Sequence, residues 1–244
     1  MKEKKIPWQT QKELQKKYKD EEVPDLAEIN RIIEDIYWGK INPERDTLRA
    51  RALFAMYYLT ACRLTEIVIK KYKYVYKVKR DSNGKSIKDK NDNYIIDNIE
   101  KIPYDYIGIK KEDISFDYIN GREVMYVRTD NRKNKNRTSK KQPIPIELER
   151  DIAQYIKDYL YKIIDPKAPL FRFCNKYASK IITESTGFNV HFIRHIRATH
   201  LITLYDFNEQ HLISFMGWTD ARPARHYMEL NKKDLFEAFY KNRR

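Results

Sequence analysis

The sequence predicts an α+β fold that is mostly α-helical, with a small antiparallel sheet flanked by helices. Two observations support this prediction: short segments of alternating polarity cluster in the middle of the chain, and helical periodicity occupies both sides of them. After Glu147 the pattern is helical throughout, with breaks near Pro166, Gly187 and Gly217. The 244 residues are enough for one sizeable core or two small ones.

Two helices are expected before the strands, after a polar arm at residues 1–22 that is rich in Lys, Gln and Glu. The first helix begins after Asp25, a residue type that caps helix N-termini. A second, mostly apolar helix is expected over about residues 46–62 and should be buried. The apolar face of the first helix is formed by Leu26, Ile29, Ile32 and Ile33.

The strands are expected between residues 71 and 145. In residues 71–106 tyrosines alternate with Lys or Val around an Asp-Ser-Asn-Gly turn at 81–84, which indicates a β-hairpin. A further pair of strands is expected at 114–116 and 124–128. A loop dense in Lys, Arg and Asn follows at 131–141, and Pro-Ile-Pro at 143–145 closes it.

The charge balance points to a polyanionic partner. The 49 Lys and Arg residues outnumber the 35 Asp and Glu residues, for a net charge of +14 and a pI of about 9.5. Nucleic acid is the first candidate partner and an anionic membrane surface the second. The longest apolar run, Ala52 to Cys62, is too short to span a bilayer, and the N-terminus lacks a secretory signal. With only two cysteines, Cys62 and Cys174, the sequence indicates an intracellular, cytoplasmic protein.

Several kinds of phosphoryl chemistry do not fit the sequence. Six scattered glycines cannot form a phosphate-binding loop, and there is no Walker-type lysine motif. Residues 89–100 match part of a calcium loop, but Tyr94 stands where the sharp turn needs Gly, which favours a polar hairpin. No carboxylate and histidine cluster suits a two-metal nuclease, so no metal site is expected. Any phosphoryl chemistry here should depend on protein cations.

Two groups of cations could bind a phosphate. His191, Arg194 and His195 stand at i, i+3 and i+4, so they share one face of a helix, and a guanidinium can donate paired hydrogen bonds to phosphate oxygens. An ordinary surface helix is the alternative. Arg63 directly follows the apolar helix, and Glu66 lies one turn later, so a structural ion pair is the alternative there. The core face of the His/Arg helix is expected to carry Val190, Ile193, Leu201 and Leu204.

These two segments resemble motifs of the tyrosine recombinase (phage integrase) family. Thr-Ala-Cys-Arg-Leu-Thr-Glu-Ile at residues 60–67 resembles the first arginine box, with Arg63 as its arginine. His-Phe-Ile-Arg-His at 191–195, followed by Ala-Thr-His-Leu at 198–201, resembles the His-x-x-Arg box. The family resemblance implies that both segments belong to one active site.

Two further motifs extend the resemblance toward the C-terminus. Phe-Met-Gly-Trp at 215–218 is similar to the Leu-Gly-His/Trp box, and Tyr227 follows Trp218 by nine residues, where the family has its nucleophile. All four motifs occur in the family order, from about Val23 to the C-terminus. The resemblance therefore implies an integrase-type catalytic domain over residues 23–244, with 71–106 as a hairpin insertion.

The resemblance also implies a role for each residue. Arg63 and Arg194 would stabilise charge on the non-bridging phosphate oxygens, and His191 would act as an acid–base or hydrogen-bonding group. Tyr227 would be the nucleophile, activated by neighbouring groups from an ordinary pKa of about 10. A covalent phosphotyrosine conserves bond energy, so neither metal nor ATP is implied. The residues that would orient or pack the site are Trp218, Glu66 and His195.

The family protonates the leaving 5′-oxygen with a lysine on a hairpin between two strands. Counting back from Pro145, Lys135 matches best and Lys133 second. Arg137 also fits some counts but is a poor proton donor because it hardly ever deprotonates. Alternatively, these cations all hold backbone phosphates. Further DNA contacts are expected from Lys133, Arg137, Lys140 and Arg197.

Three functions are open at this point. The first is site-specific recombination on double-stranded DNA by paired protomers. An amphipathic C-terminal helix at 231–240 would help to link the protomers, and docking of this helix on its own domain is the alternative. The second is strand relaxation of the type IB topoisomerase kind, and the third is a catalytically silent DNA-binding accessory role. The family's usual N-terminal core-binding domain has no counterpart in residues 1–22. The tyrosines of the insertion are expected to cover the sheet, with DNA contact as the alternative.

Overall fold

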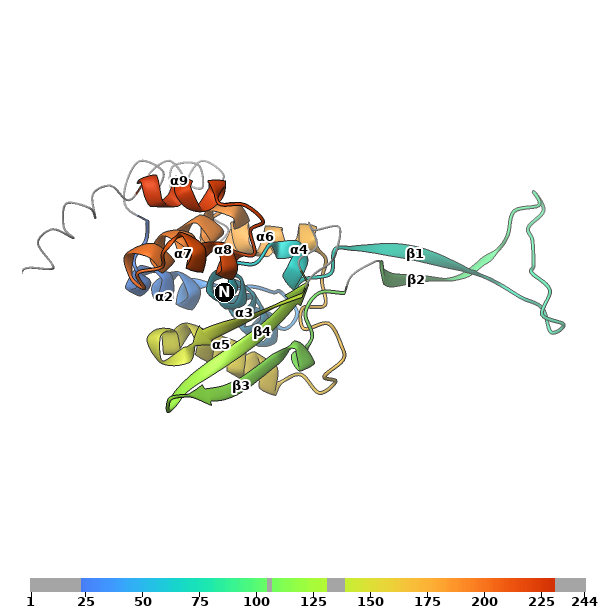
Figure 1. Cartoon of the computed structure of the whole chain (residues 1–244). Coiled ribbons are helices and arrows are strands. Elements are labelled where there is room, and N and C mark those ends of the chain that lie inside the picture. Colours follow the sequence, from blue (N-terminus) through green and yellow to red (C-terminus); the bar gives the residue numbers. More distant parts are fainter. Residues whose placement is uncertain (1–22, 105–106, 131–138, 231–244) are drawn as a thin grey trace, which may run out of the picture.

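The computed structural model describes residues 23–104, 107–130 and 139–230. It has an α+β fold, mostly α, in which helices surround a three-stranded sheet and a two-stranded ribbon extends away from them (Figure 1). The fold class expected from the sequence is confirmed. Among the described residues, no helix is both long and apolar enough to cross a bilayer.

The first two helices form as the sequence predicts. The Asp25 side chain accepts a hydrogen bond from the Glu28 amide at 2.7 Å and caps α2 (Leu26–Asp35), whose Ile29 and Ile33 are fully buried. Helix α3 (Pro43–Thr60) begins slightly earlier than expected, because Asn42 caps it and Pro43 fits a first helical turn. Its second half is buried from Ala52 onward, which makes α3 the central helix of the core.

The chain turns sharply at the end of α3. Ala61 ends the helix in the left-handed region, with φ 46°, although it carries a Cβ. Arg63 then stands at the N-cap of the single turn α4 (Leu64–Ile67). This turn therefore fixes how the Ala61 carbonyl and the Arg63 side chain are presented.

The hairpin at residues 71–106 is confirmed as a ribbon of β1 (Lys71–Val78) and β2 (Ile96–Tyr104). The turn at 81–84 is present, but a second turn at 89–92 lies between it and β2, so the loop is longer than expected. The ribbon does not pair with the other strands and projects from the body (Figure 1). Tyr74, Tyr76 and Tyr94 therefore do not cover the sheet, and their exposed fractions are 59%, 59% and 55%.

The second sheet has the order β3-β4-β5, all antiparallel. After a short 3-10 helix (Lys111–Asp113), β3 spans Ile114–Ile119, β4 Arg122–Asp130 and β5 Ser139–Pro145. The first two match the expected strands. Residues 131–141 were expected to form a loop that residues 143–145 close, so strand β5, which contains two prolines, was not predicted. It lies at the edge of the sheet, where a missing N–H is tolerated.

From residue 146 to residue 230, where the description of this part of the chain ends, the elements are all helices, as expected. A 3-10 turn (Ile146–Glu149) leads into α5 (Arg150–Tyr161), and Gly187 and Gly217 end α6 and α8 in the left-handed conformation. An additional break after α7 leaves Leu204 half exposed, so that side chain does not join the core. The other helices are α6 (Asn175–Thr186), α7 (Val190–Thr203), α8 (Glu209–Met216) and α9 (Arg222–Leu230).

A second apolar cluster lies beside the main core and supports the C-terminal motifs. It joins Ala61 from the α3 turn with side chains of α7, α8 and α9. Trp218 and Tyr227 pack against this cluster and are only partly buried. The four sequence motifs therefore meet around one cluster.

Candidate active site

Arg63 and Glu66 form a hydrogen-bonded pair at the start of α4. The Arg63 amide donates to Glu66 Oε2 and its Nη1 to Glu66 Oε1, both at 3.0 Å. Glu66 is only 2% exposed, whereas the Arg63 side chain is 28% exposed. The ion pair that the sequence offered as an alternative is thus present. It fixes the direction of Arg63 while leaving part of the guanidinium accessible.

Arg194 ties three elements together from within α7. It is 9% exposed, donates from Nη1 to the Ala61 carbonyl, and donates from Nη2 to the Met216 carbonyl at 3.1 Å. Its guanidinium carbon lies 5.9 Å from the ring centroid of Trp218. Burial lowers the pKa of Arg194, and repulsion from Arg63 contributes in the same direction. The two guanidinium groups are therefore within electrostatic reach of each other.

Tyr227 lies in an aromatic stack within the electrostatic field of Arg194. Its ring is parallel to that of Trp218, with centroids 5.8 Å and planes 9° apart, and lies 5.3 Å from the His195 ring. Gly217, with φ 65°, ends α8 and turns the chain so that Trp218 follows at once. Burial raises the pKa of Tyr227, while the charge of Arg194 opposes that rise. The phenol therefore stays protonated at neutral pH unless another group takes its proton.

The remaining expected residues differ in their positions. His191 is exposed in the first turn of α7, one turn before Arg194 and His195. Lys140, on β5, donates from Nζ to the Phe215 carbonyl at 3.3 Å, close to the Trp218 motif. Among the described residues, no group of three or more His, Cys, Asp or Glu side chains could hold a metal ion. Three expected cations lie outside the described residues: Lys133, Lys135 and Arg137.

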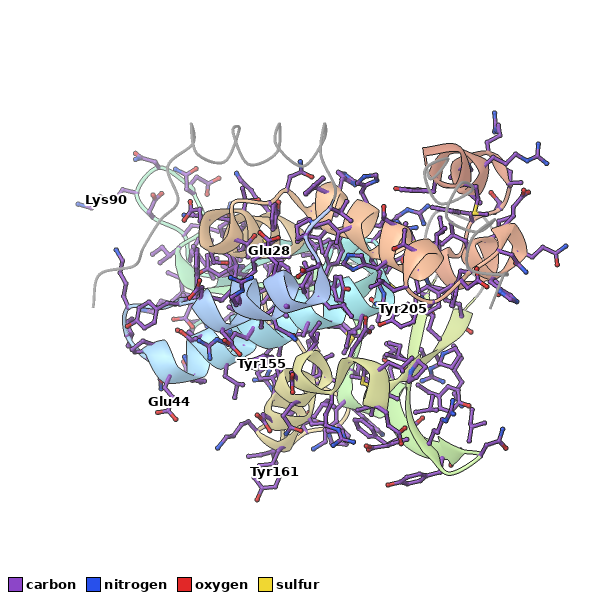
Figure 2. The ribbon with its side chains drawn as sticks, turned by 90° about the vertical axis from the view of Figure 1, so that its left-hand side faces the viewer. Glu28, Glu44, Lys90, Tyr155, Tyr161 and Tyr205 are labelled. Carbon is purple, nitrogen blue, oxygen red and sulfur yellow. The ribbon has the colours of Figure 1, made fainter. Side chains whose placement is uncertain are left out.

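Arg197 is not at a DNA-facing surface, contrary to expectation. It is 3% exposed, pairs through Nη1 with Glu149 Oε1, and lies 5.0 Å from the Tyr58 ring centroid. Tyr205, which Figure 2 shows beyond the end of α7, donates its hydroxyl proton to the same Glu149 oxygen at 2.8 Å. Because carboxylate and rings enclose the guanidinium, Arg197 anchors α7 to the rest of the protein rather than binding a phosphate.

Gln142 is a structural residue of the site that the sequence did not indicate. Its Nε2 donates to the Thr60 carbonyl at 2.8 Å and to the Phe215 carbonyl at 2.7 Å, and its Oε1 lies 3.2 Å from Cys62 Sγ. These bonds join β5 to the ends of α3 and α8. A polar residue between two prolines and two lysines gave no sign of burial, because the strand itself was not expected.

Comparisons with known proteins bear on the fold. The fold is similar to that of solved site-specific recombinases, which agrees with the fold that the resemblance in sequence implied. The chain is similar to the XerH site-specific recombinase in its post-cleavage complex with a palindromic difH substrate, with a TM-score of 0.51 and 16% identity over 87% of this chain. The pre-cleavage complex of XerH with difH gives a TM-score of 0.49, 17% identity and the same 87% coverage.

The similarity covers only part of those proteins. The chain spans about half of their length, 50% and 51% respectively. No protein-family model matches the sequence, and no curated protein matches it either. The similarity to XerH therefore assigns the fold, and the activity has to be argued from the site.

Proposed function

We propose that this chain is a tyrosine-type site-specific recombinase that cuts and rejoins DNA through Tyr227. The observation that supports this most strongly is the meeting of four distant motifs at one place: Tyr227 stacks on Trp218, contacts His195, and lies in the field of Arg194. Arg63, 131 residues before Arg194, interacts electrostatically with the same arginine. A phenol in the field of one guanidinium group, with a second guanidinium within electrostatic reach of the first, suits transfer of a phosphoryl group to tyrosine.

In the proposed reaction, Tyr227 Oη attacks the phosphorus of a backbone phosphodiester. A bond between this oxygen and phosphorus forms while the bond from phosphorus to the 5′-oxygen breaks, leaving a 3′-phosphotyrosine and a 5′-hydroxyl. Arg63 and Arg194 donate hydrogen bonds to the non-bridging oxygens, where charge develops. Attack by the 5′-hydroxyl of a partner strand reverses the step, so the number of phosphodiester bonds is conserved without ATP.

Two proton transfers accompany this step. The pKa of Tyr227 is raised by burial, so its proton must pass to an acceptor as the phosphoryl bond forms. His191, exposed one turn from Arg194, is the acceptor that we propose. The leaving 5′-oxygen takes a proton from Lys135, with Lys133 as the second candidate. The DNA substrate is double-stranded, and other protomers would assemble on it through residues 231–240, which lie outside the described residues.

A trapped covalent complex tests this proposal. Full-length protein is incubated with nicked suicide duplexes that lose the 5′-hydroxyl fragment after cleavage, and adducts stable in SDS are counted. Wild-type protein should attach to the 3′ side of the break, and Tyr227→Phe should lose the adduct while binding DNA almost normally. Tyr161→Phe, an exposed tyrosine on α5, is the matched control and should behave as wild type.

The same preparation separates the competing functions. An adduct that persists in Tyr227→Phe would assign the nucleophile to another residue. Relaxation of supercoiled plasmid without joining of two sites would favour the type IB topoisomerase function. DNA binding without any adduct in the wild-type protein would favour the accessory role.

A further inference from the structure

A groove of about 770 Å³ lies at the root of the β1–β2 ribbon, away from the aromatic stack of the candidate active site. One wall is the ribbon, through Tyr72 and Lys101, and the other is helix α6 together with the residues that lead into it. Every charged side chain among the described residues lining it is a cation. These cations are Lys101, Arg172, Lys176 and Lys180.

The walls of this groove are firmly held. Residue Ile69 forms a parallel bridge with Cys174, and its carbonyl accepts the Asn175 amide at 2.9 Å, which ties the start of the ribbon to the start of α6. Lys101 Nζ lies 4.3 Å from the centroid of the Tyr72 ring. The cations therefore project from a fixed frame rather than from free loops.

Aromatic side chains form part of the same groove. Phe173 is buried and packs edge-on against Tyr177 at a centroid distance of 5.9 Å. The indole Nε1 of Trp38 donates to the Tyr177 hydroxyl at 3.4 Å. Tyr177 is thus held in position while its ring remains accessible, as a contact for a sugar or base requires.

The groove lies close to the candidate active site along the chain. Arg63 and Tyr72 are nine residues apart, so their Cα atoms are separated by at most about 32 Å. One helical turn of DNA spans about 34–36 Å. A duplex held at Arg63 can therefore reach the groove within one turn.

The ribbon continues the groove outward. Tyr74 and Tyr76 share one face of β1 with Tyr72, and Lys101 pairs with Tyr74 on that face. An isolated two-stranded ribbon is only marginally stable in water, so an exposed aromatic face of this kind favours a partner. Lys and Arg side chains border this surface, so it attracts a polyanion. A second copy of this chain is a less favourable partner, because its own net charge is +14.

We propose that this groove binds the sugar–phosphate backbone of DNA that flanks the cleavage site. The inference rests on the proposed function, since it takes the same duplex as its ligand. Arg172 and Lys176 are the principal contacts, because both are exposed, whereas Lys180 is already 4.0 Å from the Glu184 carboxylate. The groove adds affinity without sequence information, because it contacts phosphates.

The experiment measures DNA binding as a function of salt. Full-length protein carrying Tyr227→Phe is titrated into a fluorescent, mixed-sequence duplex long enough to extend a full turn beyond the bound region. The same protein with Arg172→Ala and Lys176→Ala is compared with it. Each phosphate contact removed should reduce the slope of log K against log salt by about 0.9. The double variant should therefore have a slope about 2 smaller and weaker binding at low salt.

A matched variant controls for the loss of positive charge. Arg122, exposed at the turn between β3 and β4, lies outside the groove, and Arg122→Ala should leave the slope unchanged. If the double variant has an unchanged slope while the wild-type protein binds DNA, the groove does not bind the DNA backbone, and the proposed function is unaffected. No DNA binding by the parent protein would overturn both. If the double variant has an unchanged slope but no longer forms complexes of several protomers on DNA, the groove contacts another protomer instead of DNA.

Discussion

Trp218 and Tyr227 stack with their rings nearly parallel, the centroids 5.8 Å apart and the planes 9° from parallel. Trp218 is held by the turn at Gly217, and Tyr227 comes from the separate helix α9. Trp218 therefore orients the ring of Tyr227, the proposed nucleophile. Because Arg194 lies under the same indole, at 5.9 Å, the stack also fixes the phenol relative to that guanidinium.

Removing the indole should slow cleavage without abolishing it. An aromatic pair of this kind contributes about 0.5–1.5 kcal/mol, so Trp218→Ala should slow adduct formation by up to about tenfold. Trp218→Phe keeps a ring on Tyr227 and should retain most of the rate. Single-turnover cleavage of bound suicide DNA measures both. Equal rates for Trp218→Ala and wild type would mean that the stack does not position the phenol.

Arg194→Ala should lose both activity and stability. Loss of a preorganised donor to the phosphate should slow cleavage by about 10²–10³-fold. The Ala61 and Met216 carbonyls would also lose a buried partner, at about 1–3 kcal/mol of unfolding free energy. Chemical denaturation and cleavage rates measured on one preparation test both effects.

The effects of Arg63→Ala on cleavage and stability can be compared with those of Arg194→Ala. Arg63→Ala should slow cleavage to a similar degree, but it also leaves the buried Glu66 carboxylate without its guanidinium partner. Adding Glu66→Gln removes that charge and should restore part of the stability but none of the cleavage rate. Rapid cleavage by Arg63→Ala would remove this arginine from the proposed site.

The four motifs could be found from sequence because each is short and chemically distinctive. The backbone turns and the strand that bring these motifs together could not be found from the sequence. Ala61 adopts a left-handed conformation, which is unfavourable for residues with a Cβ. This turn orients the Ala61 carbonyl, which accepts a hydrogen bond from Arg194. Strand β5 was missed because its first residues continue a segment dense in Lys, Arg and Asn that is typical of a loop, and Gln142 was missed with it.

The assignment of Arg197 failed for a different reason. A cation one turn beyond Arg194 looks like a further phosphate ligand when only the helix is considered. Its partner Glu149 lies 48 residues earlier, and Tyr58 lies still farther away in sequence. Long-range pairing of this kind leaves no periodic pattern, so burial of the arginine could not be deduced.

The Arg197–Glu149 pair leads to a prediction about stability. Both side chains are buried, so Arg197→Ala should lower the unfolding free energy by about 3–5 kcal/mol, because the carboxylate would be left uncompensated. The partly exposed pair of Lys157 and Glu123 is the control, and Lys157→Ala should change the unfolding free energy by less than about 1 kcal/mol. Urea denaturation compares them. Equal effects of the two variants would contradict the anchoring role of Arg197.

The proposed general acid can be tested by chemical rescue. A 5′-bridging phosphorothiolate has a leaving sulfur that needs no proton, so it should restore cleavage by Lys135→Ala but not by Arg194→Ala. Rates on phosphorothiolate and normal DNA give the comparison. Rescue of Lys133→Ala instead would shift the assignment by two residues. Rescue of neither would indicate that these lysines only hold phosphates.

His200, on α7, is buried and makes a polar contact with Tyr58 of α3. Its Nδ1 is 2.7 Å from the Tyr58 hydroxyl, and the two rings meet edge to face at 5.9 Å. Burial lowers the pKa of His200 from 6.5 to about 4, and the positive charge of Arg197 contributes in the same direction. A hydrogen bond with the backbone of Pro24 and the more distant Glu149 act the other way. The imidazole is therefore neutral in the folded protein at neutral pH.

This shift should make the protein less stable in acid. Between about pH 6.5 and pH 4 the unfolded chain binds a proton at His200 that the folded chain does not, so unfolding free energy falls as pH decreases. A shift from 6.5 to about 4 corresponds to about 3 kcal/mol, present in full above pH 6.5 and lost by about pH 4. His200→Gln keeps a polar group but cannot titrate. Urea denaturation across this range should show a steeper pH dependence for wild type than for His200→Gln, and parallel curves would exclude a buried neutral His200.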